Sequence, residues 1–554
     1  MHQHAAKVSH RYLPSMPGFD ALIDEWIAGE LAESPVRATQ LGVDGHDELL
    51  GDYSAAGFER REKTDSAWLA RLADVNELSL SLDQRLDLGL LRSSLTGREI
   101  TRSWAGWRRD PGLYPGVGLQ GVFALFLHRV HSERDLARFA IARMRALPEV
   151  LEAGRTNIDP SLVAPLFVER AAGPCRAGIG YFRNLVPAEI TDDKLRSEVA
   201  AAGDAAATAL ESYLAWLSEL APMAAGDWVF GEQRYSALLL EKEVLGFDTA
   251  GLHQRGVEAF ATVEKELVEC AGKIDASSDW RTINKNLTDD HPATPDDMRA
   301  AYEMCTAKAR QFLIDHDLVT LAAGEECLVD PSPPFQRPIL AVASYATPPA
   351  FKPTLTGHFF VPFPPDGTSA AEVQQRLASN SYHSIPTITA HEAYPGHHWH
   401  LTWMQGSQRP LRKILTTPYF SEGWGLYAER VMYEHGFFET NEEVLGHLDA
   451  RIFRAARIVV DTALHTGEMT VDQAVDHMTS NTALSEATAR AEVSRYCAWP
   501  TQAASYLTGC LEIERIRGRY LDGYRGTLHE FHDKLAGAGA MPIGLAEQAV
   551  MADA

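Results

Sequence analysis

Apolar residues recur at intervals of three and four positions along most of this chain, which is the pattern of amphipathic helices. Strand-like segments are scarce, because β-branched and aromatic runs bounded by proline and glycine occur mainly at residues 338–350 and 355–364. The sequence therefore predicts a mainly α-helical protein with a small sheet just before residue 391. The stretches with the clearest helical period are 19–34, 65–95, 133–154, 188–220, 250–273, 297–316 and 440–465.

Composition supports a folded globular protein, since 45% of the 554 residues are hydrophobic and 23% are charged. No long linker and no fixed-period repeat divides the chain, so we expect a single helical domain over residues 1–554. The 75 acidic residues outnumber the 51 basic ones and give a formal charge of −24. This balance disfavours a phosphate-binding surface, and we expect no nucleic-acid partner.

The start of the chain lacks the apolar core of a signal peptide, and no run of 18 apolar residues follows. The six cysteines are far apart and form no CxxC pair, as in proteins with free thiols in a reducing compartment. We therefore expect a cytoplasmic protein with no membrane partner.

The stretch HEAYPGHHWH, residues 391–400, begins like the zinc-binding pattern His-Glu-x-x-His, but Pro395 stands where the second histidine should be. In an undistorted helix, His398 would lie nearly on the same face as His391 but about 10 Å further along the axis. That separation is too large for a shared zinc ion. Either the helix is distorted here, or these histidines are buried or exposed residues without a metal.

Pro395 and Gly396 favour distortion, because proline removes a backbone donor and glycine accepts unusual dihedral angles. A widened or kinked turn could bring His397 beside His391, with His398 as the alternative second ligand. Glu392, which follows the first histidine, would then be the general base.

A third ligand is available in EGWGLYAER, residues 422–430. Glu422 is predicted to open a helix and to complete a site of two histidines and one glutamate. Glu429, seven residues later on the same face, would hold a ligand histidine by its other nitrogen. Both glutamates could instead be solvated, but Trp424, Leu426 and Tyr427 favour a buried setting.

Three blocks, HEAYPGHH, EGWGLYAE and RYCAWPTQAASYLTG, together resemble the bacterial domain-of-unknown-function 885 family, which is similar to a divergent branch of the gluzincin metallopeptidases. Residues 231–239, the segment around TPPAFKPTLTGHFFV and residues 461–478 are also similar to the family. The resemblance implies a large helical bowl with a small β-sheet beside a buried zinc cleft, and an active-site core within residues 330–515. It implies Zn²⁺ ligands at His391, His397 and Glu422, and a base at Glu392.

Gluzincins commonly use a downstream tyrosine to stabilise the oxyanion, and Tyr506 is the first candidate here. Tyr506 shares a predicted helix face with Gln502, while Tyr496 and His465 are the weaker candidates. All of these could equally be core residues. Arg495 could pair with a substrate carboxylate or form a structural ion pair.

The strand LTGHFFVPF, which contains Gly357 and His358, is expected to be an edge along which an extended substrate aligns, or else a core strand that binds nothing. The function predicted by these features is a zinc-dependent hydrolase of short peptides, acting as a dipeptidase, carboxypeptidase or oligopeptidase. Two alternatives are a metal-dependent amidohydrolase of a non-peptide metabolite and a helical binding protein with a degenerate site. The sequence leaves open whether the protein is a monomer or a homodimer.

Overall fold

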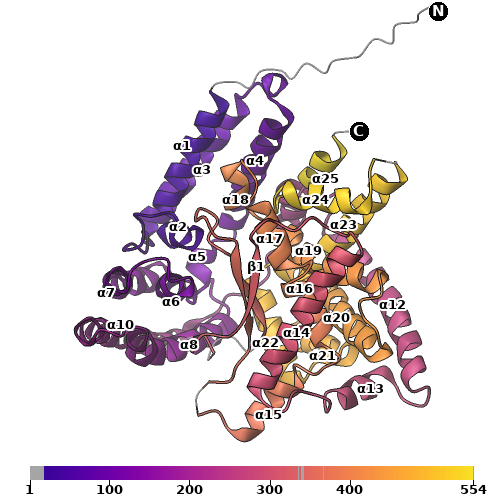
Figure 1. Cartoon of the computed structure of the whole chain (residues 1–554). Coiled ribbons are helices and arrows are strands. Elements are labelled where there is room, and N and C mark those ends of the chain that lie inside the picture. The colour runs from indigo at the N-terminus through magenta and orange to yellow at the C-terminus, as the bar shows by residue number, and fades with distance from the viewer. Residues whose placement is uncertain (1–17, 335, 338–341, 366, 524, 553–554) are drawn as a thin grey trace, which may run out of the picture.

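The computed structural model describes residues 18–552 except 335, 338–341, 366 and 524, and it is mainly helical with one three-stranded sheet (Figure 1). The longer helices before the sheet are α1 (Phe19–Glu33), α2 (Pro35–Leu41), α3 (Ala55–Ala73), α4 (Leu82–Arg102), α6 (Leu113–Leu127), α7 (Glu133–Asn157), α8 (Pro165–Gly180), α10 (Asp193–Leu220), α12 (Thr249–Ile274), α13 (Trp280–Leu287) and α14 (Pro295–Asp315). Those after it include α15 (Ala370–Ala378), α16 (Ile385–Glu392), α17 (His397–Met404), α18 (Pro410–Ile414), α19 (Pro418–Glu434), α20 (Asn441–Thr466), α21 (Val471–Asn481), α22 (Glu486–Ala498), α23 (Gln502–Asp522), α24 (Leu528–Gly537) and α25 (Ile543–Met551).

The predicted helical stretches are confirmed, with one division. The stretch 65–95 falls on two helices, because Ser81 caps a new helix by accepting a hydrogen bond from the backbone N–H of Gln84, whose side chain bonds back to Ser81. Helix α6 was not predicted, since its sequence LYPGVGLQGVFALFL is apolar on nearly every face and shows no helical period.

The sheet has the strand order β1–β3–β2. Strand β1 (Glu326–Pro331) runs parallel to β3 (Thr356–Val361), and β2 (Ser344–Ala346) pairs with β3 antiparallel. The predicted segment 355–364 contains β3 and the predicted segment 338–350 contains β2, although residues 338–341 lie outside the described residues.

The prediction that LTGHFFVPF is an edge strand is wrong, because β3 is the central strand. Gly357 pairs with Cys327 of β1, and His358 pairs with both Leu328 and Ala346. Hydrogen bonding on both sides leaves β3 no free edge for a substrate along the paired positions. The edges of this sheet belong to β1, which was not predicted, and to β2.

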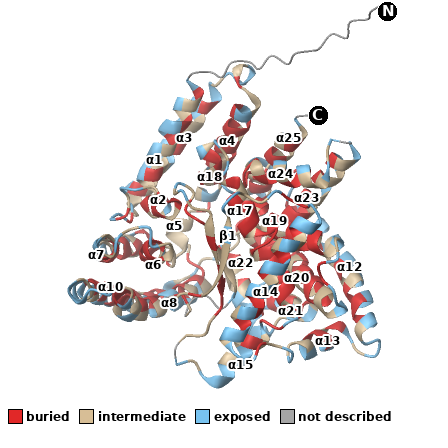
Figure 2. Cartoon of the chain, in the orientation of Figure 1, coloured by how far each residue is buried: buried red, intermediate tan, exposed pale blue. Residues whose placement is uncertain are grey.

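The sheet lies between the early helices, drawn indigo to purple in Figure 1, and the later helices that carry the candidate site. Helices α12 and α20 pack together, as do α19 and α23. Buried positions line the inner faces of these helices in Figure 2. A large apolar cluster runs from Phe19 to Val550, and a second, smaller cluster lies between α12, α13 and α20. Within the part of the chain that is described, no helix is both long and apolar enough to cross a membrane.

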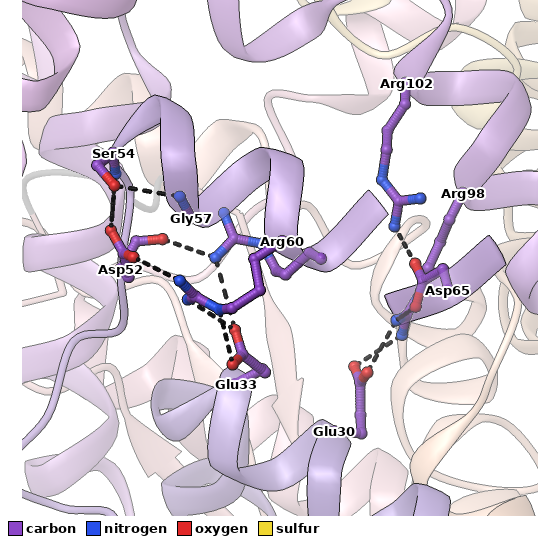
Figure 3. A network of polar contacts seen from close by, with 10 residues as sticks. Glu30, Glu33, Asp52, Ser54, Gly57, Arg60, Asp65, Arg98 and Arg102 are labelled. Carbon is purple, nitrogen blue, oxygen red and sulfur yellow. Dashed lines mark hydrogen bonds and ion pairs between the residues drawn. The ribbon is translucent and has the colours of Figure 1, made fainter. Parts of the chain in front are cut away.

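A network of charged side chains joins α1, α3 and α4 (Figure 3). Arg98 binds Glu30 through two hydrogen bonds of 2.7 and 2.8 Å, and Arg102 binds the buried carboxylate of Asp65. Arg60 bridges Glu33 and the segment before α3. Most of these groups are partly exposed, so solvent screens the pairs and each contributes little to stability.

Candidate metal centre

The backbone between His391 and His397 is broken into two helices rather than widened within one. Helix α16 ends at Glu392 and α17 begins at His397. Pro395 cannot donate to the preceding turn, and its carbonyl accepts a 2.8 Å hydrogen bond from the indole Nε1 of Trp424. A Cβ at Gly396 would lie 1.8 Å from the carbonyl oxygen of His391, so only glycine permits this close return of the chain.

The break brings His391, His397 and Glu422 together. The Nε2 atoms of both histidines lie 3.6 Å from Oε2 of Glu422, and the two imidazole rings are 4.8 Å apart at 89°. All three ligand atoms lie within 4.8 Å of one another. Ligand atoms about 2.1 Å from a tetrahedral ion are roughly 3.4 Å apart, so the donor set and its spacing fit Zn²⁺.

Glu422 lies one turn inside α19 rather than at its start, since Thr417 caps this helix and Pro418 begins it. Two glycines beside Glu422 allow the close packing that the site needs. A Cβ at Gly425 would lie 2.5 Å from Cε1 of His391, and a Cβ at Gly423 would lie 2.6 Å from Cα of Gly509 in α23. The sequence EGWG therefore makes room for a ligand histidine and for a helix crossing.

Glu429 holds His391 from the side opposite Glu422, as predicted. Its Oε1 lies 2.7 Å from Nδ1 of His391, and its Oε2 lies 3.5 Å from Nδ1 of His447, a residue that was not predicted. Burial alone would lower the pKa of His391, but hydrogen bonds to Glu422 and Glu429 outweigh burial and raise it to about 10. Glu429 therefore orients His391 and keeps its Nε2 directed at Glu422.

We expect Glu429→Gln to lower zinc affinity by about 10- to 100-fold, because an amide no longer fixes the orientation and basicity of His391. Competition with a chelator of known affinity would measure the change. Exposed Glu303 of α14 supplies the control, Glu303→Gln, which should bind zinc like the unaltered protein. An unchanged affinity for Glu429→Gln would contradict this role.

His398, the alternative second ligand, lies outside this triad. It is fully buried, its Nε2 is 2.7 Å from Oε2 of Glu325, and its Nδ1 is 2.9 Å from the hydroxyl of Tyr345. Glu325 also accepts hydrogen bonds from Tyr394 and Arg310. The histidine thus belongs to a buried polar network that reaches β2 through Tyr345 and the start of β1 through Glu325. Glu325 was missed because it precedes β1, which gave no strand signal.

Glu392 is partly buried directly after the first ligand. Burial raises its pKa, while the charges of His397 and His391 oppose that rise. Tyr506 is also partly buried, and its pKa is raised by burial and by the charge of Glu422. Its hydroxyl accepts a 3.4 Å hydrogen bond from Nε2 of Gln502, which confirms that these two residues share a helix face.

The other predicted site residues have different surroundings. The Tyr496 hydroxyl donates to Glu492 at 2.7 Å, and the residue as a whole is only 1% exposed. His465 is buried, with Nε2 3.1 Å from the carbonyl of Tyr496. Neither is among the three ligand residues, and the Tyr496 hydroxyl is already committed to Glu492.

Arg495 forms an ion pair with Glu492, the structural alternative considered from the sequence. His358 in the sheet binds Asp330 through Nδ1 at 2.8 Å. Gly357 lies against Tyr345, since a Cβ there would be 1.9 Å from the Tyr345 hydroxyl. Gly357 therefore has a packing role.

Two solved structures share this fold. The structure of a putative lipoprotein of unknown function from Shewanella oneidensis is 23% identical, with a TM-score of 0.78, and covers 96% of this chain and 99% of its own. The crystal structure of the putative lipoprotein from Colwellia psychrerythraea is 18% identical, with a TM-score of 0.78 and coverage of 96% and 98%. At such low identities the likeness shows the fold alone.

No curated protein matches the chain. Residues 35–550 match a family described as bacterial protein of unknown function (DUF885). The match includes every residue of the candidate metal centre and nearly the whole chain. The protein therefore belongs to the DUF885 family.

Proposed function

We propose that this protein is a zinc-dependent hydrolase that cleaves amide bonds in short peptides, with a gluzincin-like site. The observation that carries the proposal is the convergence of His391, His397 and Glu422, with Glu392 next to the first ligand. Two imidazoles and one carboxylate leave a fourth position for water or substrate, as in catalytic rather than structural zinc sites.

The residues of the chain have separate roles in this proposal. His391, His397 and Glu422 would hold Zn²⁺, which when bound would supply a Lewis acid that activates water and polarises the amide carbonyl. Glu392 accepts the proton of the attacking water and passes it to the leaving nitrogen. Its partly buried position raises its affinity for that proton during the transfer. Glu429 keeps His391 in the tautomer that presents Nε2.

Tyr506 donates its hydroxyl proton in a hydrogen bond to the oxygen on which negative charge develops. Its side chain is near Glu422, because α19 and α23 cross where Gly423 meets Gly509, one turn from Tyr506. Unlike Tyr496, Tyr506 is partly exposed, and its one hydrogen bond among the described residues is the 3.4 Å contact from Gln502. The phenol hydrogen is therefore available to a substrate.

We expect Tyr506→Phe to lower kcat by about 10²- to 10³-fold, with a smaller change in KM, because the lost hydrogen bond strengthens as charge develops. Steady-state kinetics on one peptide would separate the two constants. Tyr382→Phe, at a tyrosine that is 43% exposed, is the matched control and should leave both unchanged. A larger change in KM than in kcat for Tyr506→Phe would assign the residue to substrate binding instead.

The proposed function is tested on the purified protein by elemental analysis and by hydrolysis. We expect about one zinc per chain, removable by a chelator and restorable with ZnCl₂. In a panel of short peptides and acylated metabolites, the peptides should be hydrolysed. This hydrolysis should stop when the metal is removed and resume when it is restored. Hydrolysis of the metabolites alone would replace the peptidase by an amidohydrolase. If the protein bound no zinc, the remaining hypothesis would be a helical binding protein with a degenerate site.

A further inference from the structure

Three arginines, Arg170, Arg457 and Arg495, form a cluster close to Tyr506. Within the described chain, one carboxylate, that of Glu492, lies within ion-pair distance of this cluster. Its Oε2 lies 2.8 Å from Arg457 and 2.9 Å from Arg495. A single negative charge thus serves two guanidinium groups.

Arg170 has no carboxylate within 4.0 Å among the residues that the structure describes. It comes from α8, and its guanidinium lies 4.8 Å from the centre of the Trp499 ring. The Arg495 guanidinium lies 6.0 Å from the centre of the same ring, and Trp499 is 48% exposed. Asp110 attracts Arg170 only from a longer distance. Asp461 likewise attracts Arg495 and Arg457 from beyond ion-pair distance. Within that distance, the described residues offer the three guanidinium groups one carboxylate, that of Glu492.

The arginine cluster is linked to the candidate catalytic residue by direct contacts. Arg495 donates to Oε1 of Gln502 at 2.5 Å, and Gln502 donates to the Tyr506 hydroxyl at 3.4 Å. The Arg457 guanidinium lies 4.8 Å from the centre of the Tyr506 ring. Tyr506 is thus close both to the arginine cluster and to the candidate ligand Glu422.

Resting on the proposed function, we infer that the arginine cluster binds the C-terminal carboxylate of the peptide substrate, so that the protein removes residues from carboxyl termini. Guanidinium groups recognise carboxylates through paired hydrogen bonds. The side chain of Arg495 is 21% exposed and that of Glu492 is 22% exposed, so a substrate can reach this ion pair. The exposed indole of Trp499 offers an apolar surface beside the charge.

The position of the cluster favours a terminal carboxylate over an acidic side chain deep in a longer peptide. Tyr506 contacts the scissile carbonyl in the proposed mechanism, and the Arg457 guanidinium lies 4.8 Å from the centre of the Tyr506 ring. An extended chain advances about 3.5 Å per residue, so a carboxylate one residue after the scissile bond can reach the arginines. A longer chain would have to continue past Trp499 and the cluster.

The test measures binding separately from turnover. Calorimetry on zinc-loaded Glu392→Gln protein would compare three N-acetylated leucine tripeptides: one with a free C-terminal carboxylate, one with a C-terminal amide, and one amidated tripeptide with a central glutamate. We expect the free acid to bind about 10- to 100-fold more tightly than both amides, the range of one charge-assisted interaction. Adding Arg170→Gln should reduce this preference to less than about threefold. Arg176→Gln, at an exposed arginine of the same helix, is the control and should retain it.

Equal binding of the free acid and its amide would overturn the inference. Equal binding of the glutamate peptide and the free acid would overturn the assignment to the terminal carboxylate. A preference that persists in Arg170→Gln and in Arg495→Gln would place the carboxylate on the metal instead. The protein could also hydrolyse no peptide while these variants still remove the preference for the free acid. That result would support the carboxylate site and reject the proposed hydrolase. Zinc content and thermal unfolding of each variant show that the loss is not one of folding.

Discussion

Replacing Glu392 by glutamine is expected to lower kcat for peptide hydrolysis by about 10²- to 10⁴-fold while the zinc content stays near one per chain. Glutamine is nearly isosteric with glutamate but cannot accept a proton from water. Glu392 is not one of the three residues whose ligand atoms converge, so its replacement should leave the metal in place. Elemental analysis and single-turnover rates on the same preparation would show the two results together.

Glu372→Gln is a suitable control, because Glu372 is an exposed residue of α15. It should keep both zinc and turnover. If Glu392→Gln turned over within about twofold of the unaltered protein, Glu392 would not be the base. If it lost zinc as well, the residue would belong to the metal site itself.

Much of the helical fold could be predicted because the period of apolar residues is local information. Helix α20 shows this clearly, since its predicted span 440–465 corresponds to Asn441–Thr466. The order of strands in a sheet depends on segments far apart in the sequence. For this reason the sequence alone predicted β3 as an edge strand. Strand β1, ECLVDP, has charged residues near both ends and too few β-branched residues to stand out.

The members of the candidate site were predicted better than the backbone that brings them together. The residue types in HEAYPGHH and EGWG indicated the candidate ligands, but the sequence does not show that the chain forms two helices instead of one widened turn. The partners that orient these residues come from distant segments. Glu325 binds His398 across 73 residues, and no local pattern connects them.

One signal for the arginine cluster was present in the sequence. Arg457 occupies a buried position of α20, where an amphipathic helix normally carries an apolar residue. A buried arginine needs an anionic partner, so such positions indicate a charged network. The anionic partner of Arg457 is supplied by α22. The partner can therefore be identified only from the fold.

His397→Ala is expected to empty the metal site, whereas His398→Gln is expected to keep about one zinc per chain. The two histidines are adjacent, yet Nε2 of His397 lies 3.6 Å from Glu422 while Nε2 of His398 lies 2.7 Å from Glu325. Alanine removes one of three protein ligands. Glutamine at 398 leaves all three in place and can still donate a hydrogen bond to Glu325.

The order of the two variants should reverse when stability is compared instead of zinc content. His398→Gln keeps zinc but should be the less stable of the two metal-free proteins. Hydrogen bonds from His398 help to lower the pKa of Glu325 against the effect of burial, so weakening them should cost about 1–3 kcal/mol of the free energy of unfolding in the metal-free protein. His397 is partly exposed, and its buried Nδ1 has no partner among the described residues, so His397→Ala should cost less. Zinc analysis combined with denaturant unfolding of the metal-free proteins would test both. Loss of zinc from His398→Gln, with His397→Ala still loaded, would reverse the ligand assignment, because the second imidazole would then have to come from position 398.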